Sequence, residues 1–410
     1  MFRSFKLSDY DCVCLDLDNA LCRYNISNLL QLQYRLLKKQ MVDRGYNEKY
    51  FSSTLSAEDI DFIQKGLFMD FEKGNVLYLR ADGYILKASH GTSAMDAVQI
   101  EREYGKSRRW AVTDSFCVNK LSTWNGPLSD KMRSFLDYTD CQASLVFAQA
   151  VDFVDAAKGR PDRYRIWPDL LDGIVAMFSS GGGYAEAITE FPGNYLRKCD
   201  PQVIEWMKSL KSAGILLVLI TGSGESSASK TAAHCLGSNW KELFDLLIFH
   251  ACKPAFFSEK RPFVNSKETS QCSELQFGFC KAYNGGNWNA FQDSLAKFCK
   301  KSEPRCIYIG DNLIQDVYAP EAYTKCESCA VVEEIAAEGF CPGGHPDKPF
   351  LVSKRWGSYL HDNETSSDTV WGDIVKKHSH MCIPFLESFA RKPISFEFVP
   401  FWPTMVETSV

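Results

Sequence analysis

The chain has 410 residues, of which 45% are hydrophobic and 24% are charged, and its formal net charge at pH 7 is −5. These values are typical of a globular protein of roughly two to three domains, and the acidic balance argues against a surface for nucleic acid or anionic membrane. No apolar run approaches the ~20 residues of a membrane span, and the 16 cysteines are scattered without a secretory signal. We therefore expect reduced thiols and a cytoplasmic protein.

The first predicted element is a short buried strand at residues 12–15. Two aspartates one residue apart, Asp16 and Asp18, stand where this strand ends. The capped apolar pattern at residues 27–45 predicts a helix, and two apolar runs within residues 75–90 predict a β-hairpin. The stretch that follows is mostly helical and ends at a glycine-rich loop.

Four more buried strands are predicted in the second half of the chain. They lie at residues 215–220, 243–249, 306–309 and 329–334. Apolar strands separated by helices predict an α/β fold, a Rossmann-like, doubly wound and mainly parallel sheet with helices on both faces. Ligands of such sheets bind outside the carboxyl ends of the strands, so the residues that follow each strand are the functional candidates.

Carboxylates, a hydroxyl and an ammonium follow these strands in order. The candidates are Asp16, Asp18, Thr221, Gly222, Lys253, Asp311 and Asp316. Two acids spaced i, i+2 face the same side of an extended segment, so Asp16 has the chemistry of a nucleophile toward phosphorus and Asp18 that of a general acid and base. Two anions facing a phosphate require positive charge, which Lys253 and a Mg²⁺ ion on Asp311 would supply.

This ordered set resembles the four motifs of the haloacid dehalogenase superfamily, and more specifically its cytosolic 5'-nucleotidase-like branch. The matching stretches are "LDLDNALCRYN" (15–25), "KGNVLYLRADGYILKASHG" (73–91), "LLVLITGS" (216–223), "CKPAFF" (252–257), "YIGDNLIQD" (308–316) and "RWGSYL" (355–360). The resemblance implies a haloacid dehalogenase-like core with a large, mainly helical cap inserted between the first and second motifs. The implied boundaries are core 1–28, cap 29–190, core 191–335 and a C-terminal segment 336–410 that packs on the core.

The resemblance also implies a role for each motif residue. Asp16 is the nucleophile and Asp18 the acid and base; Thr221, Gly222 and Lys253 bind phosphate; Asp16, the backbone carbonyl of Asp18 and Asp311 hold Mg²⁺, with Asp316 supporting. The implied activity is Mg²⁺-dependent hydrolysis of a phosphomonoester, a nucleoside 5'-monophosphate giving a nucleoside and phosphate. The expected partner is this small-molecule phosphate ester; nucleic acid and membrane are not expected, and homo-oligomerisation is left open.

Three positions depart from the pattern of the branch. Relatives usually have an aromatic residue or His where this chain has Asn19, Thr at the position of Ala20, and Asn or Ser at the position of Gly222. Two alternatives therefore stay open. One is a catalytically weak or inactive member that acts as a nucleotide-binding or protein-interaction module; the other is a phosphatase for another small phosphate ester or a phosphoprotein.

A second metal motif lies near the end of the predicted sheet. Cys326 and Cys329, followed by Cys341 and His345, have the spacing C-x2-C-x11-C-x3-H, which suits structural zinc. Against this, Cys329 begins an apolar run that we interpret as a core strand, which favours a buried thiol over a metal ligand.

Overall fold

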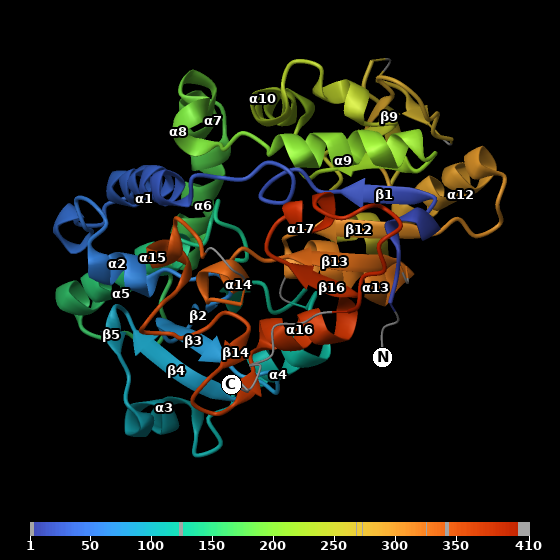
Figure 1. Ribbon diagram of the computed structural model, residues 1–410. Helices are drawn as coiled ribbons and strands as arrows, with labels where there is room; N and C mark the ends of the chain where they lie inside the picture. The colour runs from blue at the N-terminus through green and yellow to red at the C-terminus, as the bar shows by residue number, and fades with distance from the viewer. Residues whose placement is uncertain are drawn as a thin grey trace. The chain divides into compact units, whose positions relative to one another are not determined.

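The computed structural model describes residues 4–122, 126–267, 269–272, 274–324, 326–340 and 344–400. The chain forms two compact units (Figure 1). Unit 1 consists of Met1–Tyr24, Pro192–Ile335 and Ile374–Val410, and unit 2 of Asn25–Phe191 and Ala336–Asp373. In the described part of the chain, no helix combines the length and the apolar character that crossing a membrane requires.

Unit 1 is built on a nine-stranded sheet, counted over the described residues, with the order β10-β9-β11-β8-β7-β1-β12-β13-β16. Its strands are β1 (Cys12–Leu15), β7 (Leu216–Ile220), β8 (Leu246–Phe249), β9 (Phe263–Asn265), β10 (Gln271–Cys272), β11 (Ala282–Gly285), β12 (Cys306–Gly310), β13 (Glu327–Val331) and β16 (Met381–Ile383). Neighbouring strands are parallel except in the β9–β11 and β9–β10 pairs. Val13 of the central strand β1 pairs with Leu217 on one side and Ile307 on the other. The parallel α/β core predicted from the sequence is confirmed.

Four strands of this sheet were not predicted, namely β9, β10, β11 and β16. Each has only two to four residues, and the first three are partly exposed, so they lack the continuous apolar run that marks a buried strand. The last predicted strand, 329–334, begins two residues earlier in the structure and ends at Val331.

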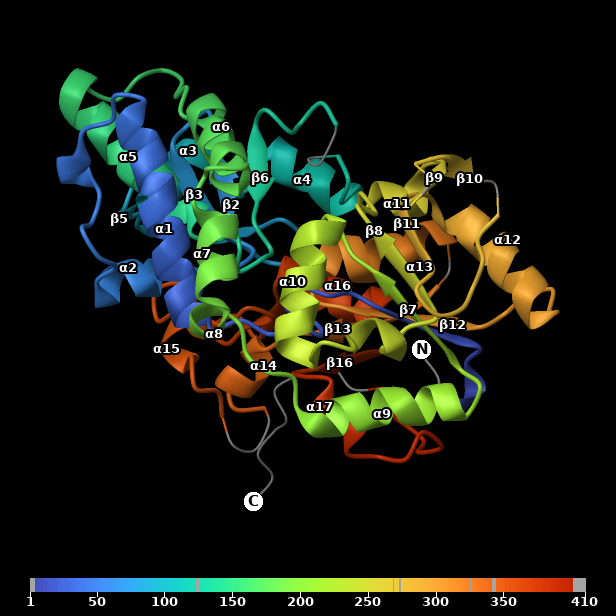
Figure 2. The ribbon, with the colours of Figure 1, turned by 90° about the horizontal axis from the view of Figure 1, so that it is seen from above.

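Helices cover both faces of the sheet in unit 1. They are η1 (Leu7–Asp9), α8 (Pro192–Tyr195), α9 (Pro201–Ser212), α10 (Glu225–Leu236), η3 (Trp240–Leu243), α11 (Ala255–Ser258), α12 (Trp288–Cys299), η4 (Leu313–Tyr318), α13 (Ala319–Thr324), α14 (Glu334–Ala337) and α17 (Glu387–Ala390). Cys12 and Cys14 of β1 join a core with Phe256 of α11 and Trp288 of α12. Figure 2 shows α9 and α17 on one side of the sheet and α11 and α13 on the other. The unit is therefore doubly wound.

Unit 2 contains a five-stranded antiparallel sheet with the order β5-β4-β3-β2-β6, again within the described residues. The strands are β2 (Phe68–Asp70), β3 (Asn75–Leu79), β4 (Ile85–His90), β5 (Ser93–Ala94) and β6 (Met132–Ser134). The helices are α1 (Ile26–Asp43), η2 (Glu48–Tyr50), α2 (Ala57–Phe62), α3 (Ala97–Tyr104), α4 (Ala111–Val118), α5 (Ala143–Lys158), α6 (Trp167–Phe178) and α7 (Tyr184–Glu190). Strands β3 and β4 form the predicted hairpin. The unit thus has more sheet than the mainly helical cap that was expected.

The C-terminal segment divides between the two units. The sequence analysis placed all of 336–410 on the core, whereas 336–373 belong to unit 2. Trp371 stacks on Phe68, with ring centroids 5.3 Å apart, and its Nε1 donates to the Gly66 carbonyl at 2.9 Å. Burial of this large indole against unit 2 accounts for the difference. The segment contains α15 (Lys348–Leu351), β14 (His361–Asp362), β15 (Ser367–Asp368) and the start of α16 (Val370–His378).

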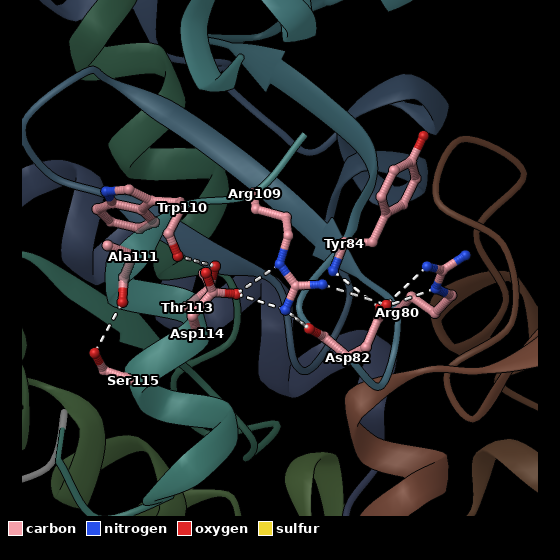
Figure 3. A network of polar contacts seen from close by, with 9 residues as sticks. All are labelled: Arg80, Asp82, Tyr84, Arg109, Trp110, Ala111, Thr113, Asp114 and Ser115. Atoms are coloured by element: carbon pink, nitrogen blue, oxygen red, sulfur yellow. Dashed lines mark hydrogen bonds and ion pairs between the residues drawn. The ribbon is translucent and has the colours of Figure 1, made fainter. Parts of the chain in front are cut away.

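The turn between β3 and β4 is bound by a network of ion pairs (Figure 3). The carboxylate of Asp82 accepts two hydrogen bonds from the Arg80 guanidinium, at 2.9 and 2.8 Å. Arg109 donates to the backbone carbonyl of Asp82 and lies 2.9 Å from the Asp114 carboxylate. The hydrogen bonds from Arg80 are the main cause that lowers the pKa of Asp82 to about 2. The network thereby links the hairpin turn to the start of α4.

Candidate active site

Two of the predicted residues follow β1 directly. The backbone N–H of Asp16 donates to the Ile309 carbonyl at 2.9 Å, so Asp16 continues the pairing of β1 with β12 and its position is set by the sheet. The carboxylate of Asp18 accepts hydrogen bonds from the Tyr24 hydroxyl at 2.8 Å and the Ser223 hydroxyl at 2.7 Å. Two donors on different oxygens fix the orientation of Asp18.

A tight turn after Asp18 brings another side chain to this edge of the sheet. The Cys22 N–H donates to the Leu17 carbonyl at 2.8 Å, and Asn19 adopts a left-handed backbone with φ 54°. Asn19 Nδ2 then donates to Asp311 Oδ2 at 3.1 Å. The sequence analysis noted Asn19 only as a departure, although Asn is one of the few residues that tolerate this conformation.

The loop after β7 contributes Thr221, Gly222 and Ser223. Thr221 is fully buried, and its Oγ1 accepts the Ser223 N–H at 3.1 Å, which leaves the hydroxyl hydrogen able to donate. A Cβ built at Gly222 would meet no atom within 4 Å, so open space lies beside this loop. Ser223, which the sequence analysis did not select, is the residue that connects this loop to Asp18.

Lys253 lies between two carboxylates in the interior of unit 1. Its Nζ is 2.9 Å from Asp16 Oδ1 and 2.6 Å from Asp316 Oδ1, and it donates to the Tyr308 hydroxyl at 2.9 Å. Burial acts to lower the pKa of Lys253, but the charges of Asp16 and Asp316 more than offset this, and the pKa is raised. Lys253 therefore remains an ammonium at neutral pH.

Strand β12 ends at Gly310, and Asp311 and Asn312 follow it. Asp316 Oδ2 accepts the Asn312 N–H at 3.1 Å, and its Oδ1 accepts from Lys253, so both oxygens of Asp316 have donors. A Cβ at Gly310 would lie 2.6 Å from atoms of the Asp316 side chain. Only glycine lets the carboxylate of Asp316 approach the strand this closely.

Three buried carboxylates converge where these loops meet. One oxygen each from Asp16, Asp311 and Asp316 lies within 4.8 Å of the others. Burial raises the pKa of Asp16 to about 8, opposed by Lys253 and reinforced by the charges of Asp316 and Asp18. Added positive charge is therefore what would keep all three carboxylates ionised, and closely spaced hard oxygens are the donors that Mg²⁺ prefers. The donor set therefore fits a divalent cation.

The described residues of the cysteine motif, Cys326, Cys329 and His345, do not form a comparable site. Among the described residues, Asp16, Asp311 and Asp316 are the one group of three or more His, Cys, Asp or Glu that could hold a metal ion. Cys329 lies in β13, and burial raises its pKa, which disfavours the thiolate that metals require. His345 Nδ1 accepts the Asp347 N–H at 3.0 Å. Cys341 lies outside the described residues.

Comparison with known proteins supports the resemblance found in the motifs. The model of the 5' nucleotidase family matches residues 1–341. The chain is 30% identical to 5'-nucleotidase domain-containing protein 1 of Homo sapiens and to its Bos taurus counterpart, and each alignment covers 98% of this chain and 94% of the relative. It is 26% identical to 5'-nucleotidase domain-containing protein 2 of Homo sapiens, over 62% of this chain and 48% of that protein.

The alignment with a solved structure from Lactobacillus delbrueckii subsp. bulgaricus covers 80% of this chain and 87% of the other chain. The identity is 11% and the TM-score is 0.28, values too low to establish a shared fold. The family match and the human and bovine relatives, by contrast, extend over the strands and loops described above. The chain therefore belongs to the 5' nucleotidase family of phosphoric-monoester hydrolases.

Proposed function

We propose that this protein hydrolyses nucleoside 5'-monophosphates to nucleosides and phosphate, with Mg²⁺, through an aspartyl-phosphate on Asp16. The observation that carries the proposal is the position of Asp16 at the end of β1, 2.9 Å from the Lys253 ammonium and within 4.8 Å of two further carboxylates. Membership of the 5' nucleotidase family supports the nucleotide as substrate.

In the first half of the reaction, an oxygen of the Asp16 carboxylate attacks phosphorus and the bond from phosphorus to the ester oxygen breaks. The protonated carboxyl of Asp18 gives its proton to the departing nucleoside oxygen. In the second half, Asp18 takes a proton from a water molecule that attacks the phosphorus, which releases phosphate and restores the Asp16 carboxylate. The hydroxyls of Tyr24 and Ser223 hold Asp18 in place for both proton transfers.

Other residues bind the oxygens of the transferring phosphoryl group. The Thr221 oxygen accepts the Ser223 N–H, and the hydrogen of the same hydroxyl can be donated to the phosphoryl group. The backbone N–H of Gly222 is the further donor proposed in the same loop. The Lys253 ammonium neutralises charge that develops on these oxygens, an effect that is strong in a buried site.

The proposed ligands of Mg²⁺ are Asp16, Asp311 and the backbone carbonyl of Asp18. Asp316 supports this site without binding the ion, because its two oxygens already accept hydrogen bonds from Lys253 and Asn312. When bound, the ion supplies the positive charge that allows a carboxylate to approach a phosphate dianion.

The test is phosphate release from a panel of nucleoside 5'-monophosphates, other small phosphate esters and phosphopeptides, with Mg²⁺ or with a chelator. We expect Mg²⁺-dependent release from nucleotides by the wild-type chain and background release by Asp16→Asn, since an amide is a poor nucleophile and a poor ligand. The mass of the intact chain, measured after rapid acid quench, should show a phosphoryl adduct in the wild type and none in Asp16→Asn.

Two outcomes would replace this proposal with one of the alternatives. Nucleotide binding without release by the folded wild-type chain would indicate a nucleotide-binding module. Metal-dependent release from other esters or phosphopeptides, but not from nucleotides, would retain the chemistry of Asp16 and change the substrate class.

A further inference from the structure

Asn19 joins the loop after β1 to the carboxylate that follows β12. Its Nδ2 donates a 3.1 Å hydrogen bond to Asp311 Oδ2 across 292 positions of sequence, and only 1% of Asn19 is exposed. A buried donor on one oxygen restrains the orientation of a carboxylate, which is how neighbouring groups orient the ligands of a metal ion. The contact therefore restrains the orientation of Asp311.

The backbone of Asn19 is held as firmly as its side chain. Its φ of 54° is left-handed, and its N–H donates to the Cys22 carbonyl at 2.9 Å. Asn is among the few residues with a Cβ that adopt this conformation routinely. The turn therefore presents the amide to Asp311 in one orientation.

The other end of this amide lacks a partner among the described residues. Asn19 Oδ1 is buried and accepts no hydrogen bond there. A buried acceptor without a donor is rare and costs stability, and in native proteins it often marks the place of a water or an ion. Mg²⁺ in protein sites usually keeps several waters, each of which is a donor.

We infer that Asn19 is a positioning residue for the divalent cation: Nδ2 orients the ligand Asp311, and Oδ1 accepts a hydrogen bond from a water on the cation. The inference rests on the function proposed above, because that function makes Asp311 a ligand. In this arrangement Asn19 acts through Asp311 and a bound water. Its effect should therefore appear in cation affinity before it appears in the chemistry.

The experiment measures cation binding to the full chain after treatment with a chelator, by calorimetry with Mg²⁺ and by electron paramagnetic resonance with Mn²⁺. Asn19→Gly is the main variant, because glycine adopts the left-handed backbone without strain while the side-chain amide is lost. We expect binding about 10- to 100-fold weaker, the usual effect of removing a group that orients a ligand. The Mg²⁺ concentration that gives half-maximal phosphate release should rise in the same proportion.

Lys300→Gly is the matched control. Lys300 is an exposed left-handed residue of the same unit, with φ 53° at the end of α12, so this variant makes the same backbone change far from the carboxylates. It should bind Mn²⁺ as the wild type does. Asp311→Asn, which removes a proposed ligand itself, should abolish binding.

The outcomes separate the two proposals. Wild-type affinity in Asn19→Gly, with binding lost in Asp311→Asn, overturns the role of Asn19 and leaves the proposed function intact. Wild-type affinity in Asp311→Asn overturns the cation site and both proposals with it. Circular dichroism melts of the metal-free variants report folding, and cation binding is compared at a temperature at which all of the variants are folded.

Discussion

Gly310 and Asp316 are so close that a Cβ at residue 310 would lie 2.6 Å from the Cβ, Cγ and Oδ2 atoms of Asp316. The carboxylate of Asp316 is in turn 2.6 Å from the Lys253 ammonium. A glycine that carries no functional group is thus required for the position of a charged residue in the site.

Gly310→Ala should displace Asp316 and its contact with Lys253. We expect a loss of about 1–3 kcal/mol in the free energy of unfolding, because the site is fully buried and the overpacking has no route of relief. The rate of phosphate release should also fall, because the contact between Asp316 and Lys253 is disturbed. Gly193→Ala, where the structure has open space, is the control and should change stability by less than about 1 kcal/mol in urea denaturation. Equal stability and activity in the two variants would contradict the steric argument.

Lys253→Met should leave Asp16 and Asp316 buried without their shared counter-charge. Removing one partner of a buried ion pair typically costs about 3–5 kcal/mol, and we expect urea denaturation at pH 7 to show a loss of this size. Adding Asp316→Asn should recover part of the stability, because one uncompensated charge is then removed. Activity should stay absent in both variants, since neither has an ammonium at the site. A double variant less stable than Lys253→Met would show that Asp316 is stabilised mainly by other groups.

Ser223→Ala should remove one of the two hydroxyls that donate hydrogen bonds to Asp18. General acid and base catalysis contributes about 10²- to 10⁴-fold, so losing one of two orienting bonds should reduce kcat by roughly tenfold with KM little changed. Ser227→Ala removes an exposed hydroxyl from α10, and steady-state kinetics of the two variants provide the comparison. If Ser223→Ala and Ser227→Ala have the same kcat, the 2.7 Å contact does not matter for catalysis.

Gly222→Ser should be tolerated by the fold, because a Cβ at this position meets no atom within 4 Å. The added hydroxyl lies next to Thr221 in the loop proposed to bind phosphate. A hydrogen bond to substrate contributes about 0.5–1.5 kcal/mol, so KM for the phosphate ester should fall about 2- to 10-fold. An unchanged KM with unchanged stability would show that Gly222 does not border the bound phosphate.

The contribution of Asp82 to the stability of the wild type should be lost at low pH. Its folded pKa of about 2 lies below the ordinary value of 3.8, so its contribution is complete above about pH 4 and is lost as the pH falls through 2. The side chain is 47% exposed, and screening by solvent limits the contribution to less than about 1 kcal/mol. Asp82→Asn should therefore be less stable than the wild type at pH 5–7, and the two should converge near pH 2. Thermal melts across this pH range test whether the stability difference between the wild type and Asp82→Asn shrinks as the pH falls, and Asp43→Asn is the surface control.

The sequence by itself determined the core strands that carry most of the motifs and the order of the candidate residues. Runs of four to six apolar residues specify buried strands locally, and in a parallel sheet their carboxyl ends must share one edge, so Asp16, Thr221 and Asp311 could be expected there together. The Asp16-Leu17-Asp18 motif at the end of β1 could be found without knowledge of distant contacts.

Only the tertiary structure decided which distant segments touch. The Asn19–Asp311 hydrogen bond depends on a left-handed turn and spans 292 positions, and the Ser223–Asp18 hydrogen bond spans 205 positions. No local sequence pattern predicts either of them. The same holds for Trp371, which places part of the C-terminal segment in unit 2 by stacking on Phe68. Periodicity encodes which face of an element is buried, but the partner that buries it is chosen by the packing of the whole chain.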